Sequence, residues 1–292
     1  MTQPKSDLMS DSRSPLPPAR PAPTPAAPDR RGFVAGALAT VWAVAVGAPR
    51  PARAQDADAS DPRLLTETVT FQARKQVYKG LLVRPRGGAK RPGLLLIPDQ
   101  RGPNSFFRQL ARRFALDGFV VMVPDLLSPY TLTQENSDEG QNILARIVPA
   151  EHLLVLDAAA DLLQHHPDCS GAIAALGFVW GGSFALQFAL SGTRVKAAVA
   201  YYVQPPSPDR AAEFKVPVQF HWVEGDPRSA PALEALEKRM IGAGRVFEAF
   251  VYPDTQSGFA SEPNSRRFNK TAADHAYDRS LFFLKRWVVT GP

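Results

Sequence analysis

The stretch "LGFVWGGSFAL", residues 176–186, decides how the rest of this sequence is interpreted. Its apolar beginning predicts the end of a buried strand, and a helix is expected to start directly after it. A strand, a tight Gly-x-Nuc-x-Gly turn and a helix form a nucleophile elbow, which exposes a reactive side chain at the tip of a strand. The central residue here is Val179, and its isopropyl group has no lone pair with which to attack.

Strand and helix patterns alternate on both sides of this stretch from Glu67 onward. Such alternation predicts an α/β fold with a mostly parallel, doubly wound sheet of about eight strands, in a single domain without internal repeats. A loop through Ser137 is expected to lead into a helix over about residues 150–164. The expected strands are residues 67–73, 77–83, 93–99, 119–125, 172–178, 196–203, 216–223 and 246–252.

The first 54 residues are expected to be a cleavable export signal rather than part of the domain. Residues 1–28 are rich in Pro, Ala and Ser, and an apolar run follows from Phe33 to Ala48. Arg30 and Arg31 before that run resemble a twin-arginine signal, and "ARA" at residues 52–54 has the small residues of a cleavage site. We therefore expect a periplasmic protein that begins at Gln55, occupies residues 55–292 and meets the membrane only through an uncleaved signal. The twin-arginine export machinery would be its partner during export.

The basic charge of the chain lies mostly in this leader. Residues 1–54 contain seven Lys and Arg and three Asp and Glu, so the remainder has 27 basic and 25 acidic residues, a net +2. No basic stripe suggests a nucleic-acid partner. The five histidines lack the spacing and companions of a zinc site, so we expect neither a metal nor a cofactor.

Parallel sheets carry their functional residues at the carboxyl ends of the strands. Four such ends stand out here, at residues 99–102, 179–181, 224–226 and 252–259. Their order is that of an α/β-hydrolase, in which the nucleophile, the acid and the histidine follow one another along the chain.

These four loops resemble the dienelactone hydrolase family over residues 65–289. "GFVWGG" is similar to the Gly-Phe/Tyr-Cys-x-Gly-Gly elbow of the family, and "YPDTQSGFASEPN" is similar to its Tyr-Pro-…-His-Gly-Phe-…-Asn-Pro segment. The resemblance implies hydrolysis of esters and lactones by a Cys-His-Asp triad. Carried over to this chain, the Cys position is Val179, the His position is Ser257, and only the acid remains, as Asp226.

No other residue is expected to replace the missing pair. Ser183 lies one helical turn after Val179 and is expected to point away from the strand ends. His221 lies within a strand and His275 on the closing helix, where structural roles are expected. Oxyanion donors could remain, because the backbone N–H of Trp180 and that of Gln100 or Arg101 require no particular side chain.

Three functions follow from this pattern. The first is non-hydrolytic binding of a small ester, lactone or carboxylate, with Asp99, Arg101, Trp180, Tyr202 and Asp226 near the floor or rim of the cleft. The second is hydrolysis by a changed mechanism, in which Asp99 or Asp226 activates water. The third is a periplasmic interaction protein whose cleft is vestigial. The sequence leaves two backbone conformations open at Val179, because a β-branched residue tolerates a positive φ poorly. Either the turn has relaxed, or it keeps the strained conformation without the chemistry that normally accompanies it.

Overall fold

A computed structural model describes residues 60–130, 138–224, 230–261 and 266–289. They contain one eight-stranded sheet in the order β1-β2-β4-β3-β5-β6-β7-β8. β1 and β2 pair antiparallel with their neighbours, and the other pairings are parallel. This confirms the predicted single-domain, mostly parallel α/β fold. The strands are β1 (Leu64–Ala73), β2 (Gln76–Pro85), β3 (Arg91–Ile97), β4 (Val120–Asp125), β5 (Cys169–Phe178), β6 (Ala198–Tyr201), β7 (Val218–Val223) and β8 (Phe247–Tyr252).

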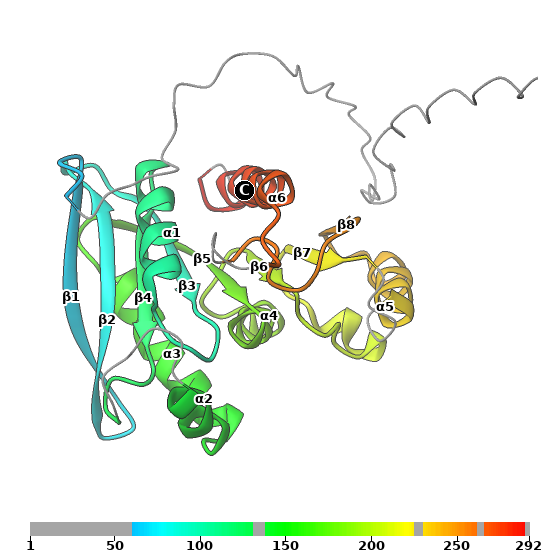
Figure 1. Cartoon of the computed structure of the whole chain (residues 1–292), viewed down its shortest axis with the longest axis horizontal. Coiled ribbons are helices and arrows are strands. Elements are labelled where there is room, and N and C mark those ends of the chain that lie inside the picture. The colour runs from blue at the N-terminus through cyan, green and yellow to red at the C-terminus, as the bar shows by residue number, and fades with distance from the viewer. Residues whose placement is uncertain (1–59, 131–137, 225–229, 262–265, 290–292) are drawn as a thin grey trace, which may run out of the picture. The chain divides into compact units, whose positions relative to one another are not determined.

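Helices cover both faces of the sheet (Figure 1). α1 (Ser105–Leu116) and α6 (Lys270–Leu284) pack on one face, while α3 (Pro149–Gln164), α4 (Trp180–Ser191) and α5 (Ala230–Gly242) pack on the other. A short α2 (Asp138–Ala145) precedes α3, η1 (Pro208–Glu213) is a 3₁₀ turn, and the π-helical segment Lys285–Val289 follows α6. α2 was not expected from the sequence.

The central strands are buried on both faces, as their continuous apolar runs predicted. In β3, Leu95 and Ile97 belong to the core under α3 and α4, whereas Leu94 and Leu96 belong to the core under α1 and α6. All four are fully buried. The two-residue period of a strand thus divides one apolar run between two cores.

Side-chain N-caps stabilise the first turns of two helices. Asn104 accepts a hydrogen bond from the N–H of Phe107 at the start of α1, and Asn269 accepts one from Ala272 at the start of α6. Such caps satisfy backbone donors that a first helical turn leaves unpaired. α4 begins without a side-chain cap, because the residue before it is Val179.

The junction between β5 and α4 is unusually close-packed. A Cβ on Gly177 would collide with the backbone of Gly181, and a Cβ on Gly181 would collide with the carbonyls of Ile97 and Pro98 at the end of β3. Only glycine fits at either position, because the obstructing atoms are backbone. The start of α4 is therefore pressed directly against the ends of β5 and β3.

Candidate functional site

Val179 keeps the backbone of a nucleophile elbow although it has no nucleophile. Its φ is +51° and its ψ is −113°, and its N–H donates to the carbonyl of Tyr201 at 2.9 Å. A positive φ in a β-branched residue costs about 1–3 kcal/mol. Of the two conformations that the sequence left open, the structure has the strained turn and not the relaxed one.

The adjacent strand, β6, is also followed by a residue with a positive φ. Tyr202 follows β6 with φ +55°, and its N–H donates to the carbonyl of His221 at 2.9 Å. Its hydroxyl accepts a hydrogen bond from the N–H of Ala260 at 2.7 Å. Tyr202 therefore ties the end of β6 to the loop after β8, which also carries Ser257.

A pocket of about 360 Å³ lies at these strand ends. It brings together residues of the predicted site, residues that follow β6 and residues at the end of β7. Its volume falls at the lower end of the range for small-molecule sites. The lining residues are Gln100, Val179, Trp180, Ser183, Tyr202, Val203, Gln204, Trp222, Val223 and Ser257.

The pocket assembles five of the eight predicted site residues: Gln100, Val179, Trp180, Tyr202 and Ser257. Asp99 and Arg101 are placed differently. Their side chains form an ion pair at 2.6 Å, and a second contact joins Arg101 Nε to Asp99 Oδ2 at 3.1 Å. Neither is among the lining residues. Asp226 lies outside the described residues.

Ser183 corrects one expectation. It was expected to point away from the strand ends, but it lines the pocket. Its hydroxyl donates to the carbonyl of Val179 at 3.4 Å. The reason is that residues four apart share one face of a helix, and the face that carries Val179 opens toward the pocket. The structure also adds Val203, Gln204, Trp222 and Val223, which were not predicted because their side chains carry no group that marks a reactive site.

The two residues expected to supply oxyanion donors, Trp180 and Gln100, both line the pocket. Trp180 is the first residue of α4, so its N–H has no acceptor within the helix. The N–H of Arg101 donates to Asp99 Oδ1 at 2.9 Å, which leaves the N–H of Gln100 as the candidate on the loop after β3. These groups could hold a carbonyl oxygen at the tip of β5.

No described residue of the pocket can act as a proton-accepting imidazole, because none of its lining side chains is a histidine. His221 is fully buried, and its ring nitrogens contact Tyr252, Gln219 and Ser280 at 2.8–2.9 Å. Burial, assisted by Arg279, holds its pKa well below the usual value, so it stays neutral. This agrees with the structural role expected for a histidine inside the sheet.

His152 was not considered from the sequence. Its ring packs edge-on against Trp180, with 4.9 Å between ring centroids, and Nε2 contacts the carbonyl of Leu144 at 3.1 Å. Burial is the main reason that its pKa is lowered. His152 therefore supports a wall of the pocket from behind rather than lining it.

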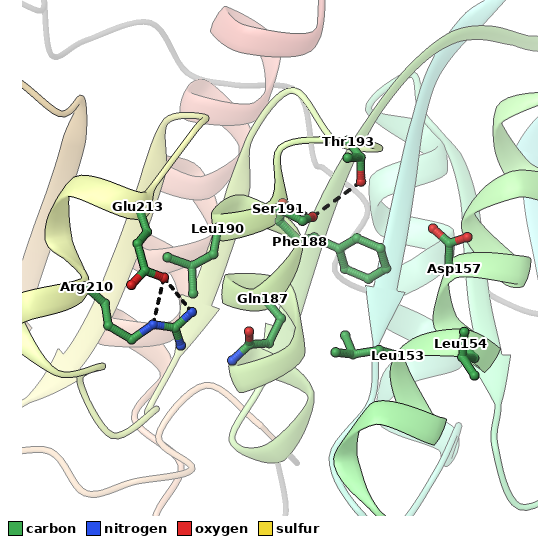
Figure 2. A pocket seen from close by; sticks show the side chains of 10 residues that line it. All are labelled: Leu153, Leu154, Asp157, Gln187, Phe188, Leu190, Ser191, Thr193, Arg210 and Glu213. Atoms are coloured by element: carbon green, nitrogen blue, oxygen red, sulfur yellow. Dashed lines mark hydrogen bonds and ion pairs between the residues drawn. The ribbon is translucent and has the colours of Figure 1, made fainter.

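A larger pocket of about 460 Å³ lies away from the strand ends, between α3, α4 and η1 (Figure 2). Its charged side chains are engaged in ion pairs: Asp157 binds Arg194 at 2.7 Å, and Arg210 binds Glu213 at 2.8 Å. Leu153, Leu154 and Phe188 provide its apolar surface. Chemically reactive groups do not gather there.

Among the described residues, no group of three or more His, Cys, Asp and Glu side chains is placed to hold a metal ion. None of the described helices is long and apolar enough to cross a membrane.

The sheet order, the elbow after β5 and the pocket at the strand ends define an α/β-hydrolase fold. Residues 78–288 match the model of the dienelactone hydrolase family. The chain therefore belongs to the dienelactone hydrolase family.

Individual relatives agree with this assignment. A carboxymethylenebutenolidase of Rhodococcus opacus is 26% identical over 211 residues, which cover 68% of this chain and 82% of the relative. The crystal structure of a dienelactone hydrolase from Anabaena variabilis has a TM-score of 0.59 and 21% identity, and covers 77% of this chain and 99% of that one. A dienelactone hydrolase-like promiscuous phosphotriesterase from metagenomic libraries has a TM-score of 0.65, 18% identity and the same coverage. At these identities the solved structures support the fold.

The strain at Val179 can be tested by Val179→Gly. Glycine would relieve a strain of about 1–3 kcal/mol and lose about 0.5–1 kcal/mol through backbone entropy. The substitution also loses burial worth roughly 1–2 kcal/mol, because 39% of the valine surface is exposed and the rest is covered. The gain and the losses nearly cancel, so we expect the free energy of unfolding in urea to stay within about 1 kcal/mol of the native value.

Val251→Gly is the matched control, because Val251 is 49% exposed and lies in strand β8 without a positive φ. This variant should lose about 1–3 kcal/mol, because it loses similar burial and the same backbone entropy without any strain to relieve. Equal losses in the two variants would show that Val179 is not strained.

Proposed function

We propose that this chain is an exported member of its family that binds a small molecule of the ester, lactone or carboxylate class without hydrolysing it. The observation that carries the proposal is the combination of a retained elbow backbone with Val179 and Ser257 in the pocket. Covalent acyl transfer needs a lone pair at the elbow and a base that titrates near working pH. Val179 supplies no nucleophilic atom, and a serine hydroxyl at the histidine position is no such base.

The remaining features of the pocket support binding. Trp180, Tyr202 and Trp222 provide aromatic surface for a flat ligand. The N–H groups of Gln100 and Trp180 would donate to its carbonyl oxygen. In an active enzyme such donors stabilise a transition state, whereas without a nucleophile they only orient the ligand.

Hydrolysis by a changed mechanism is the second candidate, and the carboxymethylenebutenolidase name of the Rhodococcus relative favours it. It requires a carboxylate that activates water. Asp99 is poorly placed for this work, since Arg101 occupies its oxygens and its side chain does not line the pocket. Asp226 would therefore have to be the base. No observation supports an interaction role with a vestigial cleft, because the described strand ends line a pocket that is still open.

Turnover separates the two candidates. We expect dihydrocoumarin to open at nearly the same rate with and without the purified protein. Any acceleration should be no more than the modest catalysis that oxyanion donors alone can give. The double variant Val179→Cys with Ser257→His should accelerate it at least about tenfold over the native protein, because it restores a nucleophile and a base. Each single substitution is a control and should gain little, since neither group works without the other.

Saturable turnover by the native protein that disappears in Asp226→Asn would contradict the non-hydrolytic proposal and support the changed mechanism. Ring opening followed by ultraviolet absorbance measures both outcomes.

Export is proposed from the paired Arg30 and Arg31 and the cleavage site before Gln55. The expected result is a protein in the periplasmic fraction of its bacterial host whose intact mass begins at Gln55. Replacing both Arg30 and Arg31 by Lys should retain the uncleaved chain in the cytoplasm, whereas Arg13→Lys with Arg20→Lys should have no effect. A native protein that keeps residues 1–54 would contradict the proposal.

A further inference from the structure

A cluster of three rings supports one wall of the strand-end pocket from behind. His152 of α3 packs edge-on against Trp180, with 4.9 Å between ring centroids, and against Phe184, with 5.6 Å. Trp180 and Phe184 also pack edge-on against each other, at 4.6 Å. Only 3% of His152 is exposed, so its ring has little room to move without displacing the indole. Because Trp180 lines the pocket, the place of the His152 ring affects the place of that wall.

The same imidazole is held by a hydrogen bond to α2. Its Nε2 lies 3.1 Å from the carbonyl oxygen of Leu144, in the last turn of α2. A carbonyl oxygen can only accept, so Nε2 carries a proton. Leu144 is itself buried, and its carbonyl also accepts the N–H of Ile147 at 3.1 Å. His152 therefore connects the end of α2 to the pocket wall.

Burial opposes a second proton on this ring. It is the main reason that the pKa of His152 lies below its usual value. The backbone of Leu144 and that of Ile147 favour the protonated ring, but they do not reverse the direction of the shift. The ring is therefore neutral at pH 7. A proton gained at lower pH places a charge where water has little access.

The neighbouring elements present two charged groups and one phenol to the ring. Arg74, in the turn between β1 and β2, disfavours the second proton, and Glu151 of α3 favours it. These two side chains form an ion pair at 2.6 Å, so their effects on the ring largely oppose each other. Tyr78 of β2 lies beside the same side chains, and burial is the main reason that its pKa is raised to about 12. From α4 come only the uncharged rings of Trp180 and Phe184.

From these contacts we propose that His152 is a positioning residue for the pocket: the neutral ring holds the Trp180 indole in place as a wall, and the ring releases the indole when it gains a proton. The charged ring moves toward water, and the indole loses the edge-on contact that braced it. For its effect on a ligand, the inference rests on the proposed binding function.

The direction of the pH dependence follows from the form of the ring that supports the wall. Only neutral His152 braces Trp180, so ligand affinity is complete above the pKa of His152 and is lost as the pH falls through it. Because burial lowers this pKa, the loss occurs below about pH 6.5, the usual value for a histidine.

The first test needs no ligand. The difference between the emission of the native protein and that of Trp180→Phe isolates Trp180 from the other three tryptophans of the chain. We expect this emission to change along one titration with a midpoint below about pH 6.5. His152→Phe keeps an aromatic ring that gains no proton, so it should abolish the titration. It should fold, since the Leu144 carbonyl keeps the N–H of Ile147.

His275→Gln is the matched control for this titration. His275 is an exposed histidine on α6, outside the three-ring cluster. Its replacement removes a titrating imidazole without touching Trp180, so the titration of Trp180 emission should stay the same.

Dihydrocoumarin provides the ligand test, because it has no group that titrates in this range. Its affinity is measured by isothermal titration calorimetry at pH 7.5 and pH 5.0. We expect the dissociation constant of the native protein to rise at least about threefold at the lower pH. His152→Phe should bind within about twofold of the native protein at pH 7.5 and should show no such rise.

The outcomes separate this inference from the proposed function. Native Trp180 emission that does not change between pH 7.5 and pH 5.0, or that titrates equally in His152→Phe, would overturn the inference and leave the binding function intact. An equal loss of affinity for dihydrocoumarin in the native protein and in His152→Phe would overturn it as well. Titration of the emission without any binding of dihydrocoumarin at millimolar concentration would support the positioning role and contradict the proposed function.

Discussion

The close approach of α4 to the ends of β5 and β3 is the constraint on which the site depends. Gly177 and Gly181 allow backbone to touch backbone at this junction, where any side chain would collide. Val179 lies midway between these two glycines, where the chain must turn sharply from β5 into α4, and this forces its φ to +51°. The framework thus imposes the elbow conformation on whatever residue occupies position 179. This explains why a valine adopts the backbone conformation of an elbow nucleophile.

The same framework creates the pocket. Because α4 starts at the tip of β5, Val179, Trp180 and Ser183 all line the pocket at the strand ends. Tyr202 closes the arrangement by accepting the N–H of Ala260 from the loop that carries Ser257. The described part of the pocket has aromatic walls, formed by Trp180, Tyr202 and Trp222, and no histidine among its lining residues.

The fold could be predicted well from the sequence, because fully buried strands such as Leu94–Ile97 have apolar runs that no surface element would carry. α2 was missed because it spans only eight residues and buries only Gly140 and Leu144. Four pocket residues, Gln100, Val179, Trp180 and Ser257, lie at strand ends that the sequence singled out, and the resemblance to the dienelactone hydrolase family indicated the triad positions among them.

The rest of the site depended on tertiary geometry that one sequence does not encode locally. The φ of Val179 results from glycines pressed against another strand, and its own β-branched side chain would argue for a relaxed turn. The pairing of Asp99 with Arg101 depends on the loop conformation, so the sequence placed both at the cleft. The direction of Ser183 required knowing which face of α4 is open.

The most direct measurement of the central claim is reaction of the native protein with an alkyl fluorophosphonate, which forms a stable adduct with an activated serine or cysteine. Intact mass spectrometry should show an unmodified chain after prolonged incubation, because the described lining of the pocket does not pair a nucleophile with a histidine base. A stoichiometric adduct that maps to Ser183 or Ser257, and is absent from heat-denatured protein, would contradict the account.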